Sequence, residues 1–451
     1  MLFVLFPNIN FFPFLNSNNQ PVAFIIVIVA WLLGLSYKIR INGYTIFLLA
    51  VIALTAFHAV FSLSLMGVFP TRTYPYPGFY NFPINAFSTA LTFISYLVGP
   101  IIFIYMLYNI KKISLWVILF FILVQLGFGV LQYFGFDAIR ESMQSLFSGI
   151  LIGFSSGKFE FGRGIAGTFP EPSHLGRYLL VITGLLLCHW HQNRNHRKLI
   201  LAGFIGVLCL MALNQSLTVV AIFALWAGLQ LVLSLLSRRF LHVSWALVIC
   251  LLFLLVLFLV PETSRIYIIF EKFQLLKFII DDFELIDLQI FGGIRFINMT
   301  IGYLSAFHFP LGQGIGSYLY TLPQTANLVG VDIWSTNYYQ EHVAVVGISN
   351  ILTKPNGYGA QLAYDFGIPG ILLLLCLAYA VIAAAVKNIK YQLMFWGLPL
   401  VGLMLIAFYT TTTFPAPWIL LALIGYYPEN SLGHVYRITL GLKQKEKRPP
   451  T

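Results

Sequence analysis

Long apolar runs separated by short polar turns dominate the chain. Many of them reach or exceed the roughly 18–20 residues that cross a hydrocarbon core as a helix, and the strict apolar–polar alternation of strands is absent. The pattern therefore predicts an all-α polytopic membrane protein with about eleven transmembrane helices. The expected spans are 21–37, 44–66, 86–110, 113–134, 173–190, 199–213, 216–236, 243–260, 357–386, 393–409 and 413–427.

Three places leave the path of the chain open. At Asn214-Gln215, and again between Thr410 and Pro415, a re-entrant hairpin fits nearly as well as a full crossing. The first 16 residues are apolar but lack the basic start and the cleavage site of a signal peptide. The pattern does not decide whether they insert or lie at the interface.

Composition agrees with a lipid environment, because 59% of the 451 residues are hydrophobic and only 9% are charged. A soluble protein of this length needs more charge to cover its surface. The net charge of +11 is uneven, since sixteen basic residues gather in short loops and a C-terminal tail with only two acidic residues. These basic residues are Lys38, Arg40, Lys111, Lys112, Arg194, Arg197, Lys198, Arg238, Arg239, Lys387, Lys390, Arg437, Lys443, Lys445, Lys447 and Arg448.

One side of the membrane thus carries +14 and the other −3. Because basic loops stay in the cytoplasm, this distribution places them and the tail 428–451 on the cytoplasmic side. The basic charge reflects topology, and nucleic acid is not an expected partner.

Two loops on the opposite side are long enough to carry function. They cover residues 135–172 and 261–356, and the second holds most of the acidic charge. Within it, residues 268–284 alternate polar and apolar positions with a helical period. This segment is predicted either to lie on the membrane interface or to form a lid on the other helices.

The stretch from Gly162 to Tyr178 gathers ionisable residues where a span begins. Pro172 suits the first turn of a helix, so Glu171, His174 and either Arg177 or Tyr178 are expected on one side of it. Ionisable residues at membrane depth indicate function, and a helix N-terminus flanked by Arg163 and Arg177 would attract a diphosphate. A salt bridge from Glu171 that only ties the helix to its loop is the structural alternative.

The second candidate stretch combines Arg295 with the glycines of Pro310 to Gly316 (PLGQGIG). Glycines at Gly312, Gly314 and Gly316 would permit close approach of the backbone to a ligand. The guanidinium of Arg295 suits phosphate oxygens, or it forms a salt bridge within its loop. Neither a zinc-ligand spacing nor a phosphate-binding loop is present, so no metal or other cofactor is expected.

Three features together resemble the Wzy-type O-antigen and capsule polymerases, within the wider O-antigen polymerase/ligase superfamily. They are Phe169 to His174 (FPEPSH) opening a helix, Arg295 ahead of Pro310 to Gly316, and a helix from near Asn356 that contains Leu362 to Gly370 (LAYDFGIPG). The resemblance covers residues from about 130 to 386, and the order and sidedness of the motifs support it more than any single motif.

The resemblance implies a GT-C-type membrane glycosyltransferase that needs neither metal nor nucleotide sugar. Such an enzyme takes a glycan from one polyprenyl-diphosphate carrier and joins it to a second lipid-linked repeat unit. The reaction would take place at the outer face of the bacterial inner membrane. Whether a chain-length regulator protein acts with it is left open.

The site residues follow from this chemistry. Arg163, Arg177 and Arg295 are the candidates that would meet the charge of the leaving diphosphate. Glu171 or His174 would be the base that accepts the proton of the acceptor hydroxyl, and the sequence does not choose between them. Gly312, Gly314, Gly316 and Tyr178 are expected to lie against the glycan.

Two alternatives stay open. An O-antigen ligase would transfer finished polymer to an acceptor, but ligases typically carry His-Asn before an acidic residue, whereas Asn356-Gly357 precedes Asp365 here. A flippase of lipid-linked sugars would need ionisable residues at mid-bilayer depth from several helices. The expected spans are almost free of charge, which favours the polymerase.

Overall fold

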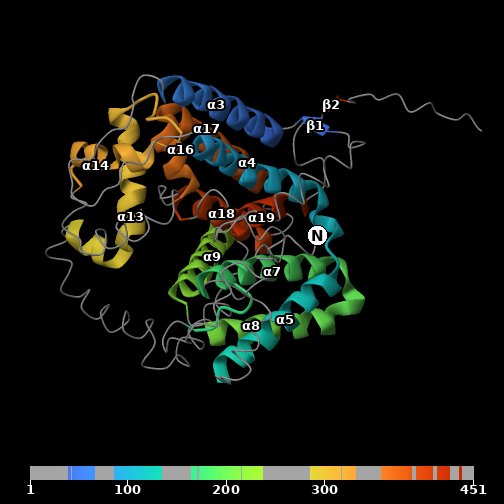
Figure 1. Cartoon of the computed structure of the whole chain (residues 1–451). Helices are drawn as coiled ribbons and strands as arrows, with labels where there is room; N and C mark the ends of the chain where they lie inside the picture. Colours follow the sequence, from blue (N-terminus) through green and yellow to red (C-terminus); the bar gives the residue numbers. More distant parts are fainter. Residues whose placement is uncertain are drawn as a thin grey trace, which may run out of the picture.

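The computed structural model of the chain is almost entirely helical (Figure 1). It describes residues 39–41, 43–66, 86–134, 164–169, 172–214, 216–236, 285–315, 317–331, 357–388, 393–409, 414–426 and 436–438. The α-helices are α3 (Gly43–Met66), α4 (Ala86–Asn109), α5 (Leu115–Phe134), α7 (Pro172–Gln192), α8 (Arg197–Asn214), α9 (Leu217–Leu236), α13 (Leu285–His308), α14 (Tyr318–Leu328), α16 (Tyr358–Phe366), α17 (Ile368–Asn388), α18 (Leu393–Phe408) and α19 (Ala416–Ala422).

Short elements complete the described parts. Three 3₁₀ turns, η1 (Ile110–Lys112), η2 (Arg194–His196) and η3 (Leu423–Tyr426), lie at helix ends. Two strands, β1 (Ile39–Ile41) and β2 (Tyr436–Ile438), pair antiparallel with Arg40 opposite Arg437. The first expected basic loop and the expected basic tail therefore lie together. This pairing is compatible with the prediction that both lie on the same side of the membrane.

Seven helices match the expected spans to within about two residues, namely α3, α4, α5, α7, α8, α9 and α18. Among the described residues, three stretches are long and apolar enough to cross a membrane, namely Phe93–Lys112, Leu115–Tyr133 and Arg197–Asn214. The structure thus has the helices of a membrane protein, while the number eleven stays a prediction. The expected spans 21–37 and 243–260 and the amphipathic segment 268–284 lie outside the described residues.

The predicted single span 357–386 is wrong in one respect, because the chain breaks at Gly367 into α16 and α17. Gly367 has a φ of 66°, and a Cβ there would clash with the carbonyl of Pro310. A glycine in the left-handed region ends a helix without the strain that a side chain would bring. The apolar run continues across the break, so hydropathy alone gave no sign of it.

The expected loop 261–356 contains two helices among its described residues. The 24-residue helix α13 packs along α16, and the shorter α14 packs against α13. Figure 1 shows both to one side of the bundle, next to α16. This part of the chain is therefore built into the fold next to a predicted motif.

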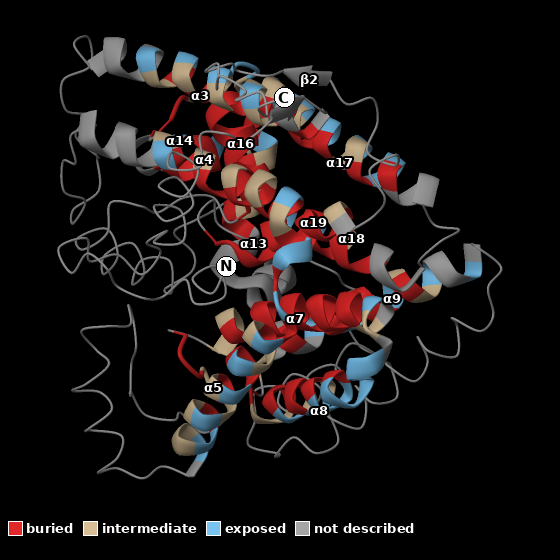
Figure 2. Ribbon diagram, turned by 90° about the vertical axis from the view of Figure 1, so that its right-hand side faces the viewer, coloured by how far each residue is buried: buried red, intermediate tan, exposed pale blue. Residues whose placement is uncertain are grey.

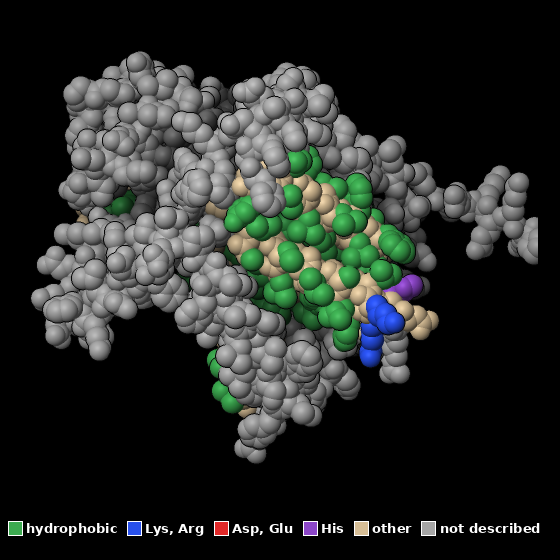
Figure 3. All heavy atoms as spheres, turned by 90° about the horizontal axis from the view of Figure 1, so that it is seen from below, with side chains coloured by type: hydrophobic (Ala, Val, Ile, Leu, Met, Phe, Trp, Pro, Cys, Tyr) green, Lys and Arg blue, Asp and Glu red, His purple; other side chains and the backbone are tan. Residues whose placement is uncertain are grey.

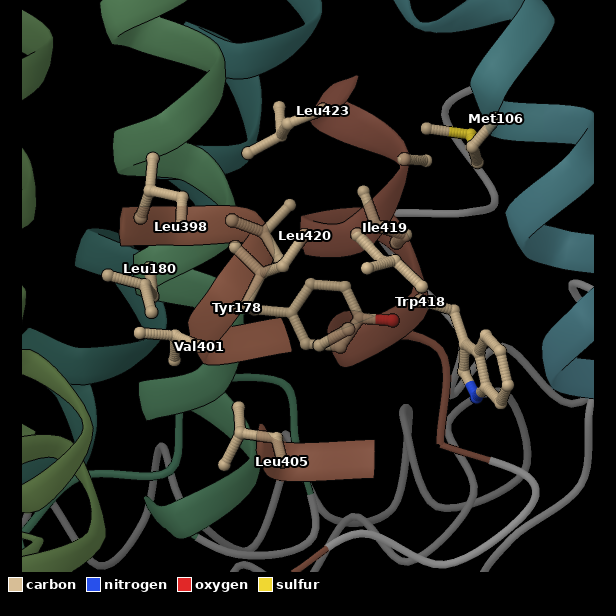
Figure 4. Packing of buried hydrophobic residues seen from close by; sticks show 14 of the residues in the cluster. Met106, Tyr178, Leu180, Leu398, Val401, Leu405, Trp418, Ile419, Leu420 and Leu423 are labelled. Atoms are coloured by element: carbon tan, nitrogen blue, oxygen red, sulfur yellow. The ribbon is translucent and has the colours of Figure 1, made fainter. Parts of the chain in front are cut away.

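The core lies where α7, α18 and α19 meet. The side chains of α19 are all buried, and most of α7 is buried as well (Figure 2). Tyr178 of α7 and Trp418 of α19 are among the largest fully buried side chains (Figure 4). A seven-residue helix can be stable here because neighbours on every side replace the solvent.

The two ends of the bundle differ in chemistry. At one end the turn at Lys111–Lys112 meets the turn at Arg194–Lys198, because His189 bonds to the carbonyl of Ile113; we call this the basic end. At the other end loop 164–169 meets the start of α7 and the C-terminus of α8; we call this the motif end. The polar chemistry of the bundle is thus divided between opposite ends of the same helices.

The close contact of Gly99 with Trp418 gives a test of the core. A Cβ at position 99 would overlap the indole of Trp418, so Gly99→Ala should lower the free energy of unfolding by about 1–3 kcal/mol. Gly127→Ala in α5 is the matched control, since nothing lies within 4 Å of a Cβ there. Thermal unfolding of both purified proteins in detergent measures the difference. Equal midpoints would contradict the packing described here.

Candidate functional site

Loop 164–169 is irregular backbone held by two glutamines of α5. The side chain of Gln125 exchanges hydrogen bonds with Thr168, accepting from its N–H at 2.9 Å and donating to its hydroxyl at 2.7 Å. Gln132 accepts from the N–H groups of Ala166 and Gly167 and donates to the carbonyl of Gly167 at 2.9 Å. Residues seven apart share one helix face, so both glutamines reach the same loop.

The start of α7 is fixed from the neighbouring helix α8. The amide of Asn214 donates to the carbonyls of Ile165 and Pro172, at 2.8 and 3.0 Å. The helix begins at Pro172, as the sequence predicted. Asn214 thereby ties loop 164–169 and the first residue of α7 to the C-terminus of α8.

The described part of the predicted shared face of α7 is confirmed by a common partner, Phe414, whereas Glu171 lies outside the described residues. The rings of His174 and Tyr178 lie 4.8 and 5.8 Å from the ring of Phe414. The guanidinium of Arg177 lies 4.5 Å from the same ring and 4.8 Å from that of Tyr409. A cation over aromatic faces is stabilised by their quadrupoles, and more strongly where water is excluded.

Burial distinguishes these three residues. Tyr178 is completely buried and packs on Phe169, whose ring is 4.9 Å away. Arg177 is only 5% exposed, whereas His174 is partly exposed at the mouth of the cluster. Burial along this face therefore increases from His174 to Arg177 and Tyr178.

The second motif, Pro310 to Gly316, caps the C-terminus of α16. The N–H groups of Gln313 and Gly314 donate to the carbonyls of Tyr364 and Asp365, each at 3.0 Å, and Ile368 donates to the carbonyl of Pro310 at 2.9 Å. The last carbonyls of a helix lack partners within it, so this turn satisfies them. Two motifs of the resemblance are therefore one structural unit.

A hydroxyl network fixes this unit to α14. The Tyr364 hydroxyl lies 2.6 Å from Oγ1 of Thr321 and 3.2 Å from Oγ1 of Thr325. Gln313 donates to Thr325 at 2.7 Å, and Tyr318 donates to the amide oxygen of Asn298 in α13 at 2.7 Å. The turn, α13, α14 and α16 thus hold one another by side-chain hydrogen bonds.

The C-terminal end of α18 connects the two motif regions. The hydroxyl of Tyr303 in α13 donates to the carbonyl of Ala407 at 2.8 Å, and Gly357 lies so close to that carbonyl that a Cβ would touch it. Two residues later Tyr409 contacts Arg177. The start of α7 and the start of α16 therefore meet the same short segment of the chain.

A buried carboxyl lies beneath this region. Asp365 is 2% exposed and accepts a hydrogen bond from the hydroxyl of Tyr96 in α4, which also lies 3.1 Å from the carbonyl of Gln361. The ring of His58 in α3 packs on Phe366 at 4.8 Å, and its Nδ1 has no hydrogen-bond partner within the described parts of the chain. The helices α3, α4 and α16 thus place His58, Tyr96 and Asp365 near one another in the buried part of the bundle.

The predicted site residues are only partly described. Arg163, Glu171 and Gly316 lie outside the described residues, and of Arg295 the structure gives the position in α13 but not the side chain. Arg295 precedes Gly302 by seven residues, about 10 Å along the helix, and Gly302 touches Ala360 of α16. Their assigned roles stay predictions.

Sequence reasoning missed Gln125, Gln132 and Tyr96 as parts of this region, and it named Asp365 within the third motif but not as a site residue. The two glutamines interrupt an apolar helix at a seven-residue spacing, and Asp365 is an acidic residue within an apolar run. Both signals are visible in the sequence. No three histidine, cysteine or acidic side chains cluster among the described residues. Neither a protein-family model, nor a curated protein, nor a solved structure matches the chain.

The fit between Gly312 and α16 can be tested with a matched pair of glycines. Gly312 (φ 79°) and Gly330 (φ 75°) are both left-handed, but only at Gly312 would a Cβ clash with the backbone of Asp365 and Phe366. Gly330→Ala should cost about 1–2 kcal/mol of backbone strain, and Gly312→Ala clearly more. Limited proteolysis and thermal unfolding would measure this difference in stability between the two variants. Equal losses would mean that the turn does not pack on α16.

The Tyr96–Asp365 hydrogen bond predicts an effect of removing one hydroxyl. Tyr96→Phe leaves a buried carboxyl without that donor, which should cost about 1–3 kcal/mol of unfolding free energy. Tyr44→Phe is the control, because its hydroxyl makes a long 3.4 Å bond to the carbonyl of Ala380. Denaturation in mixed micelles would compare the two. A smaller loss for Tyr96→Phe than for Tyr44→Phe would contradict this role.

Proposed function

We propose that the protein is a polysaccharide repeat-unit polymerase that joins polyprenyl-diphosphate-linked oligosaccharides at the outer face of the bacterial inner membrane. The observation that carries the proposal is the convergence at the motif end. The starts of α7 and α16 come from segments almost 200 residues apart, yet both contact the end of α18, and the turn after α13 caps the other, C-terminal end of α16. These are the segments on which the resemblance rests.

The reaction is an attack of one hydroxyl on a glycosyl diphosphate. The acceptor oxygen forms a bond to the anomeric carbon of the donor, and the bond from that carbon to the diphosphate oxygen breaks. The electron pair leaves with the polyprenyl diphosphate, and the hydroxyl proton passes to a base. Glu171 or His174 is the base in this proposal, and His174 is partly exposed at the mouth of the site.

Cations would stabilise the negative charge that grows on the leaving diphosphate. Arg163 and Arg295 are the candidates for direct contact, whereas Arg177, at 5% exposure, would contribute its field from beneath. Its stacking on Tyr409 and Phe414 offsets part of the cost of burying this charge. Gly312 and Gly314 support α16 at the site in this scheme.

The proposed topology has about eleven spans, with the basic end and the tail in the cytoplasm. Exposed apolar residues on α17 follow helical spacing, as expected for a face toward lipid; they are Ile368, Leu372, Leu375, Tyr379 and Ile382. In this orientation the motif end faces outward, where lipid-linked repeat units would be joined. The GT-C-like assignment belongs to the same proposal.

A ligase is the second candidate of the same chemistry, and a flippase is the candidate of a different class. The ligase shares the diphosphate leaving group and differs in its acceptor. The buried Asp365 beneath the motif end is the one observation that favours a transport role, because carboxyls within helix bundles often mark a pathway. Polymer analysis separates all three.

The test is a carbohydrate gel of the native organism with the gene deleted and then complemented. Loss of the polymer ladder, with single repeat units on the normal acceptor, supports a polymerase. Long chains left on the carrier lipid with a bare acceptor would indicate a ligase. Repeat units trapped on the cytoplasmic side would overturn the enzyme and favour a flippase.

Complementation with point variants tests the residues. Glu171→Gln and Arg295→Ala should abolish the ladder while membrane levels of the protein stay normal. Arg238→Ala, at an expected cytoplasmic loop, is the control and should restore the ladder fully. Normal polymer from both site variants would remove the assignment of these residues. If the Arg238→Ala control also lost the ladder, loss of polymer would follow from removal of any basic residue and would not identify the site.

A further inference from the structure

The basic end joins two turns that are far apart in sequence. The ring of His189 at the end of α7 bonds through Nε2 to the carbonyl of Ile113 at 2.9 Å, and its Nδ1 lies 3.1 Å from the amide of Asn193. An amide donor at Nδ1 and a carbonyl at Nε2 fit a neutral ring with its proton on Nε2. His189 therefore holds the turn after α4 against the turn before α8.

This contact gathers positive charge on one surface. Lys111 and Lys112 of the first turn are exposed, as are His196, Arg197 and Lys198 of the second. Lys112 donates to Asn109 at 3.0 Å, and the guanidinium of Arg197 lies 5.1 Å from the ring of Trp190. Neither 86–135 nor 172–236 contains an acidic residue, so the helices that carry these cations do not neutralise them.

The charged surface continues into an apolar one. On α5, Trp116, Phe120 and Leu123 are 65%, 51% and 67% exposed and follow one another at helical spacing. On the adjacent helix α8, Leu201 and Ile205 are exposed as well. Figure 3 shows this side of the molecule, where apolar side chains cover the described surface and basic side chains with a histidine lie at its edge.

The cations also lie at the limits of the apolar helices. The membrane-length stretch of α4 ends at Lys112, and that of α8 begins at Arg197. Headgroups of a bilayer lie at the ends of such stretches, and tryptophan is enriched there, as at Trp190. The phosphate of a lipid at that depth would face the lysines and arginines, and the acyl chains of the same lipid would lie along α5 and α8.

We infer that the basic end, with Lys111, Lys112, Arg197 and Lys198 as its charged groups, is a binding site for an anionic phospholipid. The recognised chemistry is a phosphate diester that carries acyl chains and a net negative charge. A soluble phosphate would satisfy the charges alone, whereas the exposed apolar face of α5 and α8 next to them favours a lipid. This site lies opposite the motif end and does not rest on the proposed function.

The test measures lipid binding to the full-length protein purified in zwitterionic detergent. Binding of phosphatidylglycerol and cardiolipin is measured by native mass spectrometry. Phosphatidylcholine, which has no net charge, is the comparison lipid. Each basic residue near a membrane surface contributes a few-fold to lipid affinity. Lys111→Gln/Lys112→Gln and Arg197→Gln/Lys198→Gln should therefore each weaken anionic-lipid binding about ten- to thirty-fold. Binding of phosphatidylcholine should not change.

The control is Lys443→Gln/Lys445→Gln, which removes the same charge from the C-terminal tail. It should leave anionic-lipid binding within about two-fold, and thermal unfolding in phosphatidylcholine nanodiscs should confirm that all three variants fold. Unchanged binding in both site variants would overturn the proposal. An equal loss in the tail variant would overturn it too, because the net charge alone would then attract lipid. Displacement of lipid by excess inorganic phosphate would identify a soluble-anion site instead.

Discussion

A backbone N–H or carbonyl without a partner is most costly where water cannot reach it, and this constraint governs the irregular segments at the motif end. Loop 164–169 meets it through Gln125 and Gln132, whose amides supply donors and acceptors in place of a regular helix. The end of α16 meets it through the N–H groups of the turn at Gly314. Each break in helical structure is matched by side chains or a turn placed to satisfy it.

That requirement also sets which glycines the fold needs. Because the turn at Gly312 must reach the carbonyls at the end of α16, its backbone passes within contact of Asp365 and Phe366. The same approach brings Pro310 against Gly367, where the chain leaves α16 for α17. A motif of alternating glycines, read from the sequence as a ligand-binding feature, thus has a structural role in the fold. The two roles are compatible, since a turn held this firmly can position neighbouring groups.

The positions of most helices could be predicted from the sequence, because an apolar run of sufficient length has few alternatives. The break at Gly367 could not, since the apolar run continues across it. The helix α19 lies within the expected span 413–427 but covers only seven of its residues. The shared face of His174 and Arg177 followed from helical spacing and is confirmed by Phe414. Phe414 itself was not predictable, because more than 220 residues separate it from α7. The contact between Tyr96 and Asp365 was missed for the same reason. The roles of Arg163, Glu171 and Arg295 stay predictions, because the structure does not describe their side chains.

The contrast between the cations at the two ends bears on what each can do. Lys111 and Arg197 are exposed, so water or lipid headgroups screen them and their positions need little precision. Arg177 is buried beside Tyr409 and Phe414, where its charge is desolvated and the aromatic rings offset part of that loss. A charge in such surroundings acts more strongly and over a longer distance, because the medium around it polarises less than water. Under the proposed function, that is the property required of a cation that stabilises a diphosphate only while it leaves, and an exposed lysine could not replace it.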